Sequence, residues 1–242
     1  MPIAITALDP WNFELDLNYG YAGSTGRYDV ANQKFGNTKR ADNLRSGWLA
    51  KGLVEYKMDW GTPGFFAWYG SGDDGNVKNG SERMPYISPC GNFTSFMGDG
   101  ADRGWSLHNA GWAQQGYDMM MNYSGTWGLG LQLKDMSFME DLKHTFRVAY
   151  WAGTNNPTMA KYLPSTAATS HVDAGTVYLT TNDCLVEFNL DSTYQIYENL
   201  SATLELGYII NGIDKGTWEG YNKANFSKGD AYKAALIFNY SF

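Results

Sequence analysis

Apolar and polar residues alternate along most of this chain with a period of two. The run that ends the sequence is the clearest, with Tyr232, Leu236, Phe238 and Tyr240 on one side and Lys233, Ala235, Ile237 and Asn239 on the other. Similar runs cover 12–21, 48–59, 65–71, 117–134, 145–152, 183–196 and 200–210. Successive side chains of a β-strand point to opposite faces, so this period predicts strands. We therefore expect an all-β protein with about eight antiparallel strands.

The connections between these runs are sorted by length. Short ones lie at 59–64, 135–143 and 197–200, and long ones at 23–46, 72–115, 154–182 and 211–229. Short turns on one side and long loops on the other are typical of transmembrane β-barrels. A soluble β-sandwich predicts the same alternation but gives no reason for this sorting. The pattern favours a single transmembrane antiparallel β-barrel domain over 1–242.

Composition agrees with a barrel and excludes other classes. The 242 residues carry a net charge of -7, which argues against a nucleic-acid-binding protein. Mean hydropathy is -0.41, and no apolar run is long enough for a membrane helix. A barrel allows this because half of each strand faces a polar interior. Residues 1–5 lack the basic start and apolar core of a signal peptide, so we expect a mature form or a piece of a longer precursor.

One face of the predicted strands carries charged residues that we expect to line a pore. They are Glu14, Asp16, Lys51, Glu55, Lys57, Arg147, Glu187, Asp191, Glu205 and Lys233. In a barrel of about sixteen strands, water in the channel would solvate them. In a closed barrel of about eight strands, they would have to pair with one another, because lone buried charges are costly. The balance of acids and bases permits either case.

The connection 72–115 is long enough to predict a functional loop. In a pore it would fold inward as a constriction, and the alternative is an exposed surface loop. Its charged residues are Asp73, Asp74, Arg83, Asp99, Asp102 and Arg103. The stretch 73–76 offers oxygen donors of the kind that calcium prefers. A solvated acidic turn is the favoured interpretation, so we predict no metal site.

The sequence gives little sign of catalysis. His108 with Asp99 or Asp102 is the pair that a barrel enzyme would use, but no catalytic set and no cofactor motif follows from the spacing. We predict a protein that is not an enzyme and that needs no cofactor. Cys90 and Cys184 could form a disulfide in an exported protein. Two cysteines without distances leave both the paired and the free state open.

The end of the chain carries a family resemblance. Phe238, Tyr240 and Phe242 look like the C-terminal signature that the barrel-assembly machinery of the bacterial outer membrane recognises. The stretches 133–157 ("LKDMSFMEDLKHTFRVAYWAGTNNP"), 178–209 and 231–242 resemble the homotrimeric outer-membrane porins of sulfate-reducing bacteria. The likeness is clear from about residue 116 onward.

This resemblance implies a homotrimer in the bacterial outer membrane, surrounded by lipid and lipopolysaccharide. It also implies passive diffusion of small hydrophilic solutes and ions through a barrel of about sixteen strands. The chain is too short for such a barrel, so we expect the C-terminal half of a porin or a small relative. The alternatives are a small closed barrel that serves as an anchor or surface-binding protein, and a barrel enzyme.

Overall fold

The computed structural model of the chain describes residues 2–5, 8–23, 28–29, 34–35, 44–76, 79–84, 93–95, 125–158, 179–222 and 229–242. Within these ranges it contains a nine-stranded antiparallel sheet, a two-stranded hairpin and one helix. The order of the large sheet is β1-β2-β5-β6-β7-β8-β9-β10-β11, so each strand lies beside its neighbours in sequence. The prediction of an all-β, antiparallel architecture is confirmed.

The elements have the following bounds. The large sheet contains β1 (Pro2–Ile5), β2 (Trp11–Ala22), β5 (Arg45–Tyr56), β6 (Thr62–Gly70), β7 (Thr126–Met139), β8 (Leu142–Gly153), β9 (Cys184–Tyr197), β10 (Leu200–Gly212) and β11 (Ala231–Tyr240). The hairpin consists of β3 (Tyr28–Asp29) and β4 (Lys34–Phe35), and the helix α1 spans Lys215–Asn222. The first part of the predicted run 117–134 lies outside the described residues.

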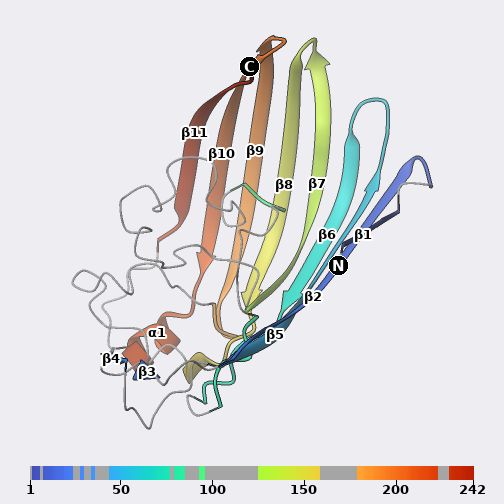
Figure 1. The fold of residues 1–242 in the computed structure, drawn as a ribbon. Helices are drawn as coiled ribbons and strands as arrows, with labels where there is room; N and C mark the ends of the chain where they lie inside the picture. The colour runs from blue at the N-terminus through green and yellow to red at the C-terminus, as the bar shows by residue number, and fades with distance from the viewer. Residues whose placement is uncertain are drawn as a thin grey trace.

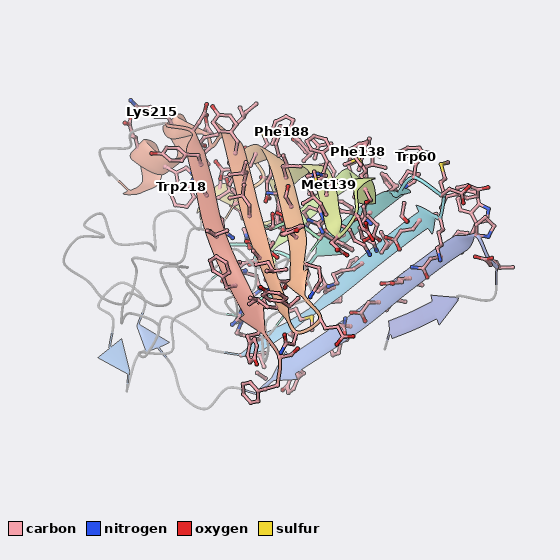
Figure 2. The ribbon with its side chains drawn as sticks, turned by 90° about the horizontal axis from the view of Figure 1, so that it is seen from above. Trp60, Phe138, Met139, Phe188, Lys215 and Trp218 are labelled. Atoms are coloured by element: carbon pink, nitrogen blue, oxygen red, sulfur yellow. The ribbon has the colours of Figure 1, made fainter. Side chains whose placement is uncertain are left out.

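The sheet forms a curved wall rather than a flat layer (Figures 1 and 2). The short connections after β5, β7 and β9 lie at one end, here called the turn end. The connections that follow β2, β6, β8 and β10 leave from the other end, here called the loop end. β1 and β11 are the two edge strands and do not pair with each other, so the sheet that the structure describes is not closed.

Three of the predicted connections differ in detail from the structure. The connection expected at 135–143 is only a tight turn at 140–141, because β7 continues to Met139. Asp135, at φ 58°, lies where the pairing of β7 with β8 shifts register. A bulge of this kind lets a strand continue with altered phase.

The connection expected at 211–229 contains α1, and the connection at 23–46 contains the β3–β4 hairpin. The helix begins after Asp214, whose Oδ2 accepts hydrogen bonds from the backbone N (2.7 Å) and Oγ1 (2.6 Å) of Thr217. This is a helix N-cap. The short β1, which pairs with β2, was also not predicted.

The outer face of the wall is apolar and exposed. In the middle of the strands it presents Leu15, Leu17, Leu129, Leu131, Leu190, Leu204, Leu206 and Leu236. Figure 2 places Phe188 and Phe138 on this side and Trp218 of α1 away from it. Among the described residues there is no helix with the length and apolar character needed to cross a membrane.

Candidate functional site

The inner face of the wall gathers the charged residues that the sequence assigned to one side. Cross-strand pairs place Asp16 opposite Lys51, Arg147 opposite Asn189 and Asp191 opposite Glu205, and directly opposed residues share a face. Glu14, Glu55, Glu187 and Lys233 have the same phase on their strands. Lys57 is the exception, since it lies just beyond the end of β5 and is exposed.

Four of these residues form a row of charges across the last four strands. Arg147 of β8 pairs with Asp191 of β9 at 2.5 Å, and Lys233 of β11 pairs with Glu205 of β10 at 3.0 Å. The two acids lie directly opposite each other in the β9–β10 pair. Like charges in this position destabilise a sheet unless they are compensated. The bases on the flanking strands supply that compensation.

Glu55 is the centre of a second polar group. Its side chain is nearly buried and accepts hydrogen bonds from Asn12 Nδ2 (2.9 Å), Gln132 Nε2 (2.7 Å) and Lys134 Nζ (2.7 Å). These donors come from β2 and β7, on either side of the β5–β6 pair. We did not predict Asn12, Gln132 or Lys134 as site residues. Their polar phase on the strands was the available signal.

Toward the loop end the inner face becomes an aromatic core. Phe66, Trp68 and Trp151 are almost fully buried, and the rings of Trp68 and Trp151 lie 4.3 Å apart. Gly128 and Gly130 of β7 make room for this cluster. A Cβ at Gly128 would lie 2.3 Å from the Trp68 ring, and one at Gly130 would lie 2.3 Å from the Phe66 ring. The sequence did not show which β6 aromatics point to the inner face. The space that Gly128 and Gly130 leave on the inner face is occupied by the rings of Trp68 and Phe66.

Part of the long loop 72–115 lies against the inner face. The Phe93 ring stacks on Phe66 at 4.7 Å, and Lys51 Nζ lies 5.4 Å from its centroid. Ser95 donates from Oγ to Asp191 at 2.8 Å and accepts from Lys233 Nζ at 2.7 Å through its carbonyl. The loop therefore places at least the segment 93–95 inside the curved wall. Asp99, Asp102 and Arg103 lie outside the described residues.

The other residues predicted for the constriction lie beyond the loop end of β6. Asp73 Oδ1 accepts from the backbone N of Gly75, and Asp74 Oδ1 accepts from that of Asn76, both at 2.7 Å. Asp73, Asp74 and Glu82 bring carboxylate oxygens within 4.8 Å of one another. Asn79 Nδ2 bonds to both Asp74 and Glu82. Amide donors thus hold this acidic group together, although Asp73 itself is buried. That the group binds no metal stays a prediction. Arg83 follows Glu82 in the same connection, and its backbone N donates to Ser81 Oγ at 3.3 Å.

Two buried polar side chains that we did not predict hold the loop end together. Asn155 accepts from the backbone N of Asp73 and donates to the carbonyls of Gly125 and Leu179. Asp183 accepts from Thr180, from the backbone N of Asp214 and from Trp218 Nε1. Asn155 and Asp183 are each 1% exposed. Apart from Thr180, three residues before Asp183, their partners are distant in sequence, so a local pattern could not reveal how they hold the loop end together.

The remaining candidates are dispersed. Cys184, at the start of β9, forms no disulfide with any described residue. Cys90 lies outside the described residues, so their pairing stays a prediction. His108 also lies outside them. His144 lies at the turn end of β8 and hydrogen-bonds Ser192 Oγ at 2.8 Å.

No protein-family model matches this chain, and no curated protein matches it either.

Proposed function

We propose that this chain forms part of the wall of an outer-membrane porin, through which small hydrophilic solutes and ions diffuse passively. The opposite character of the two faces of one curved sheet is the observation that carries the proposal. Leu206 on the outer face is 38% exposed, whereas Glu205 beside it on the inner face is 4% exposed. A sheet that exposes its apolar side and gathers charges on the other suits lipid outside and a polar interior.

Aromatic residues at both ends of the strands support a position across a membrane. At the loop end the outer face carries Tyr19, Tyr21, Trp48, Tyr69 and Trp127, and at the turn end it carries Trp11, Trp60, Phe138, Tyr197 and Tyr240. Amphipathic rings prefer the two membrane–water interfaces. The leucines between these bands would face the hydrocarbon core.

The direction of the edge strands argues against direct closure of the nine described strands. The described sheet has nine strands, each antiparallel to its neighbours, so β1 and β11 run in the same direction. Direct closure between them would pair parallel strands, which barrels of this class do not use. An odd number of further strands restores the antiparallel order. About seven would give the roughly sixteen strands of a water-filled barrel.

The proposed partners follow from this placement and from the family resemblance. They are outer-membrane lipid and lipopolysaccharide, two further copies of the chain in a homotrimer, and the barrel-assembly machinery. The aromatic end of the chain is available for the last of these, since Phe238, Tyr240 and Phe242 are all more than 60% exposed. No cofactor and no catalytic activity are proposed.

A second candidate is a small closed barrel that acts as an anchor. The pairing of Arg147 with Asp191 and of Lys233 with Glu205 favours it, because a filled interior requires its charges to be neutralised. The two proposals differ in whether water crosses the barrel.

Conductance of the purified native protein in a planar bilayer, with its full mass determined alongside, tests the proposal. We expect conductance steps in groups of three, from a protein with about twice the mass of this chain. The reason is that this chain supplies about eight strands, whereas a water-filled barrel has about sixteen. A silent bilayer together with a 27.0 kDa monomer would contradict the porin and favour the anchor.

Neutralising two inner-face bases is expected to change ion selectivity. Lys51→Met together with Arg147→Gln removes positive charge beside the segment 93–95, where Lys51 lies over Phe93 and Arg147 pairs with Asp191. Permeability to anions should fall relative to cations, because the uncompensated acids attract cations. The reversal potential in a salt gradient measures this change.

The matched control is Lys57→Gln with Lys215→Gln, which removes the same charge from two exposed positions off the inner face. This pair should leave the reversal potential nearly unchanged. Equal shifts of the reversal potential in both double variants would mean that ion selectivity depends on the net charge of the protein and not on the charges of the inner face.

A further inference from the structure

The segment Phe93–Ser95, here called the strap, contacts both sides of the curved wall. Its Phe93 end stacks on Phe66 of β6 at 4.7 Å and lies under Lys51 of β5. Its Ser95 end contacts side chains of β9 and β11. Three extended residues span at most about 10 Å. The strap therefore bridges strands that are far apart in the order of the sheet.

The polar groups of Ser95 are all held by side chains. Its backbone N donates to Asn189 Oδ1 (3.2 Å) and its Oγ donates to Asp191 Oδ1 (2.8 Å). Its carbonyl accepts from Lys233 Nζ (2.7 Å). A hydrogen bond that involves a charged group is stronger than a neutral one. The contacts with Asp191 and Lys233 are thus the stronger anchors of this end.

Lys233 differs from the other anchors because it belongs to an edge strand. Asn189 and Asp191 lie on β9, which is paired on both sides, by β8 and β10. Lys233 lies on β11, which among the described strands is paired by β10 alone. The same Nζ also pairs with Glu205 of β10 at 3.0 Å. One ammonium group therefore connects the strap, β10 and the last strand.

We propose that Lys233 couples the binding of the strap to the inner face with the pairing of β11 to β10. The strap would then narrow the space inside the curved wall only after the last strand has paired. β11 has its backbone ladder with β10 and can dock without the strap. Without β11, the carbonyl of Ser95 in the strap loses the hydrogen bond from the charged Lys233 side chain. The coupling itself rests on the contacts above, and its effect on conductance rests on the proposed function.

Hydrogen exchange of the full chain, folded in lipid vesicles, tests the coupling. In Lys233→Met the amides of 93–95 should exchange about 10- to 100-fold faster, which is the loss expected for one charged hydrogen bond. The amides of β11 should keep their protection, because the ladder with β10 remains. Lys233→Arg, which keeps the charge and the donors, should restore most of the protection of the strap.

Two controls make the result specific. Glu205→Gln weakens the ion pair but leaves the bond from Lys233 to Ser95 possible, so the strap should stay protected. Lys233→Gln keeps a donor on a shorter, neutral side chain and should give an intermediate rate, and it serves if Lys233→Met fails to fold.

Unchanged exchange of 93–95 in Lys233→Met and Lys233→Gln would overturn the proposal, since the contacts with β9, β5 and β6 would then hold the strap without Lys233. Equal acceleration of the strap and of β11 would also overturn it, because Lys233 would then merely stabilise the strand. Where the protein conducts, the released strap should increase single-channel conductance. If the wild-type protein does not conduct, the proposed function is contradicted. The exchange result still tests the coupling between Lys233 and the strap.

Discussion

Replacing Leu206 by arginine is expected to lower the free energy of unfolding in lipid by about 2–4 kcal/mol. Leu206 lies at the middle of β10, opposite Leu190 of β9 and Ala234 of β11, with its side chain on the outer face. A charged side chain near the bilayer midplane loses its hydration, and the cost falls toward the interfaces. The urea midpoint of the protein folded in vesicles measures the change.

The matched control for this experiment is Asn239→Arg. Asn239 lies on the inner phase of β11, near the turn end, and is exposed. The same charge added there should change the free energy of unfolding by less than about 1 kcal/mol. Equal destabilisation by the two arginines, or an unchanged midpoint in Leu206→Arg, would count against lipid contact at the outer face.

Replacing Asp183 by alanine is expected to release α1 from the sheet. The carboxylate, of which almost nothing is exposed, accepts from Thr180 N (2.8 Å), Thr180 Oγ1 (2.6 Å), Asp214 N (2.7 Å) and Trp218 Nε1 (3.1 Å). Each buried donor left without a partner costs about 1–3 kcal/mol. Two of these donors, Asp214 N and Trp218 Nε1, belong to the α1 segment, so the free energy of opening the helix should fall by about 2–6 kcal/mol.

Hydrogen exchange over residues 213–222 measures this opening directly, and we expect rates close to those of an unfolded peptide. The strands should keep their protection, because local units open independently of the core. Asp230→Ala is the control, since Asp230 also accepts two hydrogen bonds, from Tyr208 and Asn211, but is exposed. A protected helix in Asp183→Ala would show that the apolar contacts of Trp218 suffice to hold α1.

Local pattern was enough to predict the eight long strands of the sheet and, except in β6, their two faces. The side chain of each strand residue alternates between faces, so Lys233 and Leu236 are assigned to opposite sides as soon as the strand is recognised. The pattern failed where pairing geometry decides, as at Asp135, where a register shift extends β7 beyond its predicted end. It also missed α1, because eight residues with few apolar positions give too weak a helical period.

The sequence by itself determined that this is a sheet with one apolar face and one charged face, because alternation is a property of neighbouring residues. Only the tertiary structure decided which charges meet. Arg147 and Asp191 are far apart in the chain and become partners through the register of β8 and β9. The tertiary structure also decided that Ser95 lies on the inner face, since its anchors Asn189 and Lys233 come from strands almost a hundred residues or more away. Contacts over such separations depend on how the wall curves, and a period of two carries no information about curvature.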